Sequence, residues 1–356
     1  MKKVVVLGHF AFGLDKANGQ TIKTKVVGDE LKRAFGKDEV DFEDTMGGWR
    51  FMLRLPMVLT RMLWSHSNIV ILPAYKGVLI IVPLLVIFNT VFHRRLHYVV
   101  IGGWLPEYAR KYPILRFFLK RIDMIYVETY YMASCLTDDF HFKNILVMPN
   151  SKPLQALKEE EIPVYVNAPF RLCTFSRVMR EKGIEDAIHA VCASNQLLGS
   201  NLFTLDIYGL VEPGEEEWFR QLMSQQPEEI KYGGIIPTNK STEVLQHYFA
   251  LLFPTHFKTE GFAGTLIDAM AAALPPIASK CHSNVELIED GKTGLLFPIG
   301  SIEDLTAILM KIAHDPTIIQ QMRSNCLRLS GKYEPHQVFS VLTKEIETHH
   351  HGTESV

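Results

Sequence analysis

The sequence predicts an α/β fold with two domains, each built on a parallel sheet that helices cover on both faces. Short apolar runs rich in β-branched residues recur along the chain, and helical patterns separate them. This alternation is typical of parallel sheets, because a parallel connection needs a crossover that a helix supplies. The 356 residues exceed the usual size of one domain and suit two.

Twelve strands are expected, six in each half of the chain. Those of the first half are 3–7, 40–43, 68–73, 97–101, 124–127 and 144–148. Those of the second half are 170–175, 202–208, 230–232, 250–253, 276–278 and 294–297. A charged stretch and Pro163 within 150–168 are typical of a linker. We therefore expect an N-terminal domain at 1–160, a C-terminal domain at 161–333, and a helix with a polar tail at 334–356.

Composition and charge narrow the class of protein. Hydrophobic residues make up 47% of the chain and charged residues 21%, as in ordinary soluble proteins. Five scattered cysteines without CxxC spacing, and a start without a signal-peptide apolar region, predict reduced thiols in a cytoplasmic protein. Residues 1–150 carry 20 Lys and Arg against 13 Asp and Glu, and the remainder is net −9. A basic half favours an anionic partner: nucleic acid, an acidic substrate or a membrane surface.

Three apolar segments of this basic half bear on a membrane partner. The run 77–91 is too short to span a bilayer easily and contains Pro83 and Asn89, so we expect a mostly buried helix. The segments 49–64 and 110–121 mix aromatic and aliphatic residues with arginines. Such segments either lie in a membrane interface or form ordinary amphipathic helices with solvated arginines, and the sequence favours both about equally.

Open parallel sheets bind ligands beyond the carboxyl ends of their strands, so the residues after each strand are the first candidates. After the first expected strand come Gly8 and His9, and Gly19 opens a helix that carries Lys23 and Lys25. The spacing is not GxGxxG, so a dinucleotide site of the dehydrogenase type is poorly supported. Amides at a helix N-terminus favour an anion, although a plain tight turn explains the glycines equally well.

Two cations follow the first expected strand of the second half. Arg177 lies at the strand end and Lys182 at the start of the next helix, so both can converge on one diphosphate. Two solvated surface cations are the alternative. The carboxylates further along the chain favour the diphosphate site over two solvated cations.

Two carboxylates follow the strand expected at 250–253. Glu260 precedes a glycine-containing loop, and Asp268 lies one turn into the next helix, so both can face one site. Carboxylates accept hydrogen bonds from sugar and ribose hydroxyls. A hydrolase acid/base pair is the alternative, but the adjoining helix start and glycines fit a nucleotide better.

These motifs resemble a known family when taken together. They are Arg177 with Glu181-Lys182-Gly183, Glu260-Gly261-Phe262 with an acid eight residues on, Pro275-x-Ile277-Ala278-Ser279, and Glu289-Asp290-Gly291-x-Thr293-Gly294. They resemble the donor domain of retaining glycosyltransferases of family 4, over nearly all of 145–330. The resemblance implies the GT-B fold, with two Rossmann-like domains whose parallel sheets face an interdomain cleft. The N-terminal half is similar mainly in layout, to bacterial transferases of capsule or O-antigen assembly.

The resemblance also implies roles for single residues. Arg177 and Lys182 are expected to bind the donor diphosphate, Glu260 to contact the donor sugar, and Asp268 to hold the ribose. Arg177, Lys182 and Glu260 form the expected catalytic set. The other residues expected at the donor are Gly19, Gly261, Phe262, Ala263, Gly264, Thr265 and Leu266.

Two positions depart from the family's pattern. The second acid is Asp268 where a glutamate is usual, so its ribose contact is expected to be longer or rearranged. Many members carry a histidine after an N-domain strand, where this chain has Gly102, Gly103 and Trp104. We expect these three residues to contact the acceptor or the donor sugar, with Trp104 stacking on a sugar face. His9 and His256 follow expected strands and are further candidates for such a contact, although a structural role explains each histidine equally well.

The sequence thus predicts a retaining hexosyltransferase that uses a UDP- or GDP-sugar and a glycan or lipid-linked acceptor in cell-surface polysaccharide biosynthesis. The nucleotide sugar is a co-substrate, and neither a cofactor, a metal ion nor nucleic acid is expected. The expected location is the cytoplasm, with the anionic inner face of the plasma membrane as a further partner. Two alternatives stay open: a nucleotide-sugar sensor or scaffold without transferase activity, and a sugar-nucleotide epimerase.

Overall fold

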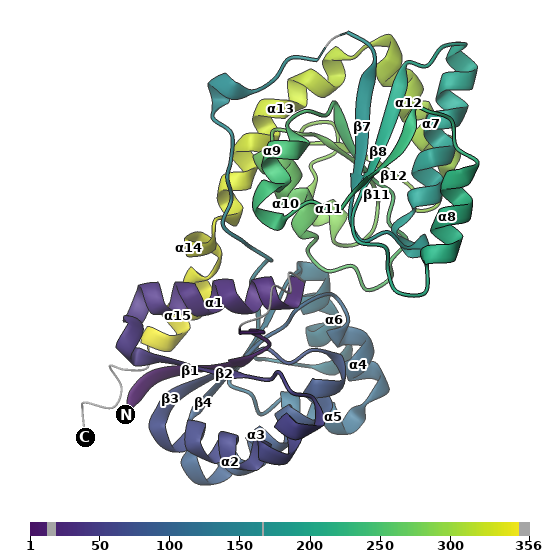
Figure 1. Ribbon diagram of the computed structural model, residues 1–356. Helices are drawn as coiled ribbons and strands as arrows, with labels where there is room; N and C mark the ends of the chain where they lie inside the picture. Colours follow the sequence, from purple (N-terminus) through teal and green to yellow (C-terminus); the bar gives the residue numbers. More distant parts are fainter. Residues whose placement is uncertain (13–18, 166, 349–356) are drawn as a thin grey trace. The chain divides into compact units, whose positions relative to one another are not determined.

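The computed structural model describes residues 1–12, 19–165 and 167–348 (Figure 1). The chain forms two compact units. The first contains Met1–Pro153 together with the C-terminal segment from Tyr333, and the second contains Leu154–Lys332. Each unit holds a six-stranded sheet whose strands pair in parallel, which confirms the predicted α/β class.

The first sheet has the order β2-β1-β3-β4-β5-β6. Its strands are β1 (Lys2–Gly8), β2 (Val40–Asp44), β3 (His66–Ile71), β4 (Arg95–Val99), β5 (Met124–Val127) and β6 (Ile145–Val147). Alternate residues of β1 belong to different cores: Val4 and Val6 to one, Val5 and Leu7 to the other. Because both faces are buried, the strands appear in the sequence as continuous apolar runs.

Helices cover the two faces of this sheet unequally (Figure 1). The larger core lies under α2 (Trp49–Ser65), α3 (Val78–Phe92), α4 (Leu105–Lys111), α5 (Pro113–Leu119) and α6 (Tyr130–Phe140). The smaller core lies under α1 (Gly19–Phe35), α14 (Pro335–Val338) and α15 (Ser340–Glu347). The end of the chain thus completes the core of the first unit.

The second sheet has the order β12-β11-β10-β7-β8-β9. Its strands are β7 (Phe170–Phe175), β8 (Phe203–Tyr208), β9 (Ile230–Gly234), β10 (Ala250–Phe253), β11 (Pro276–Ser279) and β12 (Leu295–Phe297). The helices of this unit are α7 (Ile184–Leu198), α8 (Glu216–Ser224), α9 (Ser241–Leu245), α10 (Gly264–Ala271), α11 (Asn284–Leu287), α12 (Ile302–His314) and α13 (Thr317–Ser330). A short 3-10 turn, η4 (Arg180–Lys182), precedes α7.

Every strand expected from the sequence is present, with ends shifted by a few residues. The helix expected at 77–91 is present as α3, but the expectation that it is mostly buried is wrong. Only 28% of the window Tyr75–Phe92 is buried, and Ile87 and Val91 expose 51% and 76% of their surface. A helix that is apolar all round predicts burial from its sequence, yet this one presents a whole side outward.

Two other helical segments differ from expectation in their boundaries. The segment 110–121 is not one amphipathic helix, because α4 ends at Lys111 and α5 begins at Pro113. Tyr112 between them has an extended φ of −122°, as a residue before proline prefers. The single C-terminal helix expected from Pro335 is two short helices, and the final histidines lie outside the described residues.

Candidate functional site

The order of the second sheet places a reversal between β7 and β10. From β7 the chain proceeds to β8 and β9 on one side, and then crosses to β10, β11 and β12 on the other. In open parallel sheets, ligands bind beyond the carboxyl ends of the strands at such a reversal. Arg177 and Lys182 follow β7, and Glu260 and Asp268 follow β10, so four of the expected site residues come from the two segments that flank this point.

At this edge Lys182 and Glu260 form a buried ion pair. The side chain of Lys182 is 8% exposed and that of Glu260 is 11% exposed. The Thr255 hydroxyl donates a hydrogen bond to the same carboxylate at 3.0 Å. Two opposite charges out of water need close pairing and further hydrogen bonds to be tolerated. An anionic ligand that contacts Lys182 here meets an ammonium group already held in place.

Gly183 explains how Lys182 reaches this position. It adopts a left-handed φ of +69° between η4 and α7. A Cβ on Gly183 would lie 2.0 Å from the carbonyl oxygen of Pro254, so the turn approaches the loop after β10 more closely than any other residue allows. The His256 amide donates to the Glu181 carbonyl at 2.7 Å and fixes the same contact.

We expect Gly183→Ala to lower both stability and nucleotide binding. The left-handed backbone costs alanine about 1–3 kcal/mol, and the clash with Pro254 forces the turn and Lys182 away from Glu260. Thermal unfolding and nucleotide titration measure the two effects. Gly199→Ala is the matched control, because Gly199 ends the same helix at a φ of +62° and a Cβ added there would have no neighbour within 4 Å. Equal behaviour of the two variants would show that the close approach at Pro254 has no consequence.

The N-terminus of α10 is the second element suited to an anion. Its N-cap residue is Ala263, which has no side-chain acceptor for the first-turn amides, and its first turn contains no acidic residue. Such a helix start offers amide donors and a positive dipole end to a negative group. The Thr265 hydroxyl donates to the Phe175 carbonyl at 2.6 Å, which fastens this helix start to the end of β7.

The nearby start of α7 differs from that of α10. Its first turn carries Glu185 and Asp186, and Asp186 contacts the ring of His256. These carboxylates already complement the helix dipole. The groups of this edge that are suited to an anion are therefore the start of α10 and Lys182. His256, which the sequence left as a candidate for the ligand, is tied to Asp186.

The remaining expected residues of this edge lie on the same loop and helix. Gly261, Phe262, Leu266 and Asp268 are buried, whereas Ala263, Gly264 and Thr265 are partly exposed. Arg177 is half-exposed and its guanidinium contacts Glu212 at 2.9 Å. In the structure Arg177 and Lys182 therefore contact different carboxylates, and a diphosphate would have to draw Arg177 from Glu212 for both to bind it.

Sequence reasoning missed the polar support of this site. The Ser279 hydroxyl donates to the Thr255 carbonyl at 2.7 Å, and the Asn284 side-chain amide donates to the Ser279 carbonyl at 2.9 Å. Burial raises the pKa of the nearby Cys281 thiol, and the charge of Glu260 adds to the rise, so this thiol stays protonated at neutral pH. Their sequence signal is position, since Thr255 and Cys281 lie two residues beyond the ends of β10 and β11 and Ser279 is the last residue of β11.

The first unit corrects one expectation and shows where a lysine of its first helix lies. Trp104 is 1% exposed, donates its indole N–H to the Ile101 carbonyl at 2.7 Å and stacks on Tyr75, so it is a core residue and not a platform for a sugar. Lys23 is 2% exposed and pairs with Glu128 at 2.5 Å, so its charge is engaged inside the fold.

The other candidates of the first unit lie after strands or at a helix start, as the sequence predicts. Gly19 begins α1 and is exposed, while Asn18 and the loop before it lie outside the described residues. His9 follows β1 and is partly exposed, as are Gly102 and Gly103 beyond the end of β4. These residues follow strands at the carboxyl edge of the first sheet, and their contacts with a ligand stay a prediction.

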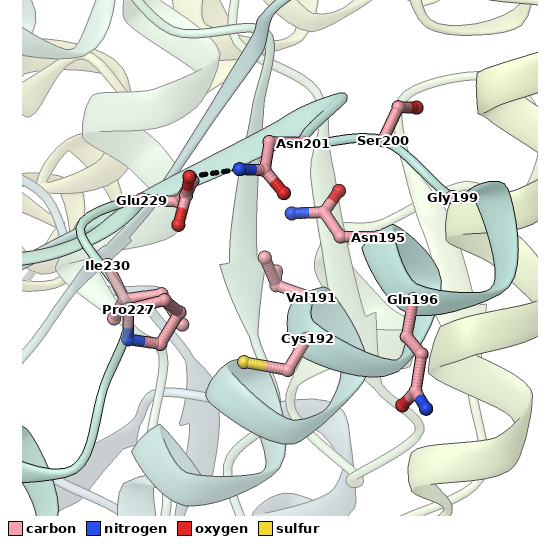
Figure 2. A pocket seen from close by; sticks show the side chains of 10 residues that line it. All are labelled: Val191, Cys192, Asn195, Gln196, Gly199, Ser200, Asn201, Pro227, Glu229 and Ile230. Carbon is pink, nitrogen blue, oxygen red and sulfur yellow. Dashed lines mark hydrogen bonds between the residues drawn. The ribbon is translucent and has the colours of Figure 1, made fainter.

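A separate pocket lies near the amino ends of strands of the second sheet, with a volume of about 340 Å³ (Figure 2). Its wall includes Cys192 and Asn195 from the C-terminal half of α7, and Glu229 and Ile230 at the start of β9. These residues precede their strands or end their helix, so the pocket is remote from the carboxyl edge. Within the described part of the chain, no group of three His, Cys, Asp or Glu side chains is placed to hold a metal ion.

Comparison with known proteins matches the second unit to a family. Residues 158–328 match the family model of glycosyl transferases group 1. The GtfA subunit of the UDP-N-acetylglucosamine–peptide N-acetylglucosaminyltransferase of Streptococcus pneumoniae is 32% identical over 182 residues, 50% of this chain and 34% of GtfA. The amylovoran biosynthesis glycosyltransferase AmsK of Erwinia amylovora is 24% identical over 188 residues, 51% of this chain and 46% of AmsK. This chain thus matches less than half the length of each relative.

Among solved structures, Anabaena HepE in complex with UDP and glucose superimposes with a TM-score of 0.75 and 15% identity, over 98% of this chain and all of HepE. Pneumococcal GtfA in complex with UDP and GlcNAc gives a TM-score of 0.67 and 20% identity, over 85% of this chain and 60% of GtfA. At these identities the likeness establishes the fold alone.

Proposed function

We propose that this chain, whose residues 158–328 match the family model of glycosyl transferases group 1 and whose two parallel sheets have the GT-B fold, transfers a hexosyl unit from a nucleotide diphosphate sugar to a saccharide or lipid-linked acceptor. The observation that carries the proposal is the Lys182–Glu260 ion pair at the same sheet edge as the uncapped start of α10. The donor is assigned to the second unit and the acceptor to the first.

The chemistry of this edge fits a sugar diphosphate. The ammonium of Lys182, the first amides of α10 and the guanidinium of Arg177 suit the diphosphate, with Arg177 released from Glu212. The carboxylate of Glu260 can accept hydrogen bonds from the sugar hydroxyls, in place of the bond that it now accepts from the Thr255 hydroxyl. Asp268, one turn into α10, is assigned to the ribose.

These groups also suit the reaction. When the bond between the sugar and the diphosphate breaks, negative charge grows on the departing phosphate oxygens. Lys182 and the α10 amides are fixed before the reaction, so they stabilise that charge without a cost of reorientation. No general acid is required for this leaving group, because the diphosphate is already a weak base. We propose that the transfer proceeds with retention at the anomeric carbon, as the resemblance to family 4 implies.

UDP is the nucleotide we assign, because GtfA is the subunit of an enzyme named for UDP-N-acetylglucosamine and the HepE structure is a complex with UDP. Polysaccharide synthesis is assigned for a parallel reason, since AmsK acts in amylovoran biosynthesis and a further relative, 31% identical over 157 residues, is a putative colanic acid glycosyltransferase. Cytoplasmic location and independence from metal ions belong to the same proposal.

A donor panel tests the function. We expect UDP-sugars to raise the unfolding temperature of the protein more than GDP-sugars do, and one of them to release UDP when saccharide acceptors are added. Nuclear magnetic resonance of the product then reads the anomeric configuration. Binding without release for every acceptor would favour a sensor, and failure of every nucleotide sugar to bind would overturn the proposed donor site.

A further inference from the structure

Helix α2 presents an outward side with two parallel stripes. Trp49, Leu53, Met57 and Trp64 expose 69%, 74%, 61% and 75% of their surface. At 100° per residue these four side chains fall within one narrow sector of the helix. Arg50, Arg54 and Arg61 fall in the adjoining sector and are also exposed. The opposite side of α2 packs into the core through residues such as Leu55, Leu59 and Met62.

Helix α3 lies against α2 and continues the apolar stripe. Ile80, Ile87 and Val91 expose 45%, 51% and 76% of their surface, and their spacing of seven and four residues aligns them on one side. The helix contains no charged residue. Phe92 at its end meets Trp64 of α2 edge to face, with ring centroids 6.2 Å apart.

Helix α5, which packs on the far side of α3, adds Ile114 and Phe117, exposed by 74% and 53%. We call the outward side chains of α2, α3 and α5 the apolar surface. The three helices cover the same face of the first sheet and lie side by side (Figure 1). By contrast, the exposed large apolar residues of the second unit lie on separate elements; they include Leu197, Val285 and Ile299. A contiguous apolar surface marks an interaction site, whereas scattered residues do not.

The charge around the apolar surface has one sign. Residues 45–122, which contain all three helices, hold 11 Lys and Arg and a single acidic residue, Glu107. Arg50 and Arg54 border the stripe of α2, and Lys120 and Arg121 are exposed at the end of α5. Some of these cations are paired within the fold, as Arg61 is with Glu43. The surroundings nevertheless remain strongly basic.

We propose that this surface docks the protein on an anionic lipid bilayer, with the apolar side chains of α2, α3 and α5 inserted at the level of the headgroups. Exposed tryptophans beside arginines suit the interface between acyl chains and anionic headgroups, because each provides an apolar body and a polar or charged end. The basic surroundings complement the negative surface potential of such a membrane. If the partner were a protein and not a membrane, its surface would need both a wide apolar area and an excess of acidic residues.

The arrangement indicates docking and not spanning. By length and composition alone, Tyr75–Phe92 is apolar enough to cross a membrane, with a mean hydropathy of 2.0. Yet Ile81, Val82 and Leu85 of α3 are buried in the core of the first sheet, so this helix cannot leave the fold without exposing that core. Only its outward side is available to lipid.

Flotation of the full chain with vesicles tests the proposal, without any sugar nucleotide, so that its outcome is independent of the proposed transferase. We expect binding to vesicles of phosphatidylcholine with phosphatidylglycerol and much weaker binding to phosphatidylcholine alone. Replacing Trp49, Leu53 and Trp64 by Gln should lower the partition constant at least about tenfold, because three large side chains lose their lipid contact. Arg50→Gln with Arg54→Gln should lower it roughly fivefold per arginine, on anionic vesicles only.

The matched control replaces three exposed apolar residues of the second unit by Gln. They are Leu197, Val285 and Ile299, which expose 68%, 50% and 52% of their surface. This triple variant should bind as the unchanged protein does, and circular dichroism should show both triple variants folded. Equal binding to neutral and anionic vesicles would overturn the proposal. So would absence of vesicle binding together with a dimer in sedimentation that the α2 variant dissociates, because a second copy would then cover the apolar surface.

Discussion

Lys182→Ala is expected to lower kcat/KM for the nucleotide-sugar donor by about 10²- to 10³-fold, the range observed when one fixed donor to a developing oxyanion is removed. The expectation rests on the position of Lys182 at the carboxyl end of β7, beside Glu260 and the start of α10. Alanine removes a cation that is buried and already held by Glu260, whereas the guanidinium of Arg177 is half-exposed and contacts Glu212.

The variant has a second effect that must be separated from the first. The side chain of Glu260 is 11% exposed in the structure, and its carboxylate loses its cation when Lys182 is removed. A buried carboxylate without its partner destabilises the fold and disfavours an anionic ligand. Glu260→Gln in the same chain removes that charge. Because Glu260 is itself assigned to the donor sugar, the measurement that separates the two effects is binding of UDP without a sugar. If Lys182 acts on the diphosphate, the double variant recovers stability but not UDP affinity. Recovery of UDP affinity would mean that Lys182 serves only to neutralise Glu260.

Lys292→Ala is the matched control for Lys182→Ala. Lys292 also pairs with a glutamate, Glu289 at 3.4 Å, but both side chains are exposed, by 73% and 57%. It lies on the loop before β12, at the amino end of that strand, away from the carboxyl edge. Its removal should change kcat/KM less than twofold, on the scale of other exposed pairs. If both lysine variants lose activity equally, the assigned donor site is wrong.

The strands could be predicted because both faces of each parallel sheet are buried. Valines, isoleucines and leucines then occur in runs, as in β1 and β10, and the runs mark the strands without reference to tertiary contacts. The position of the site could be predicted by the same reasoning, since Lys182 and Glu260 lie in the segments that follow β7 and β10. Their contact with each other also requires the turn at Gly183, which is marked in the sequence only as a glycine before a helix.

The direction in which a side chain points could not be predicted from the sequence. Trp104 follows two glycines beyond β4, a place suited to a ligand, but its ring turns inward to Tyr75 and Tyr108. The opposite happened in α3, where apolar residues predicted burial and one side faces outward. In both cases the outcome depends on which neighbouring helix covers the residue, and that is a property of packing between distant segments.

The buried ion pair of the first unit carries the largest expected effect on stability. Lys23, on the first turns of α1, contacts Glu128 at 2.5 Å and donates to the Val100 carbonyl at 3.0 Å. Glu128 follows β5 and Val100 follows β4, so one ammonium group joins α1 to the ends of two strands. Both charged side chains are at most 3% exposed. Each therefore contributes to compensating the hydration that the other loses on burial.

We expect Lys23→Met to destabilise the protein by about 3–5 kcal/mol, because methionine fills the space of the lysine stem but removes the ammonium group that pairs with the buried carboxylate of Glu128. Denaturant unfolding measures this free energy, and the unfolding temperature should fall on the order of 10 °C. The control is Lys25→Met on the same helix, which alters an exposed lysine and should stay within about 0.5 kcal/mol.

The double variant Lys23→Met with Glu128→Gln separates a charge effect from a packing effect. If the loss arises from the uncompensated carboxylate, neutralising it restores much of the stability, as replacement of whole buried pairs does elsewhere. If the loss arises from the lost anchor between α1 and the Val100 carbonyl, the double variant remains as unstable as Lys23→Met. A single variant as stable as the Lys25→Met control would contradict both explanations, and the buried pair would then have no structural role at this edge of the first sheet.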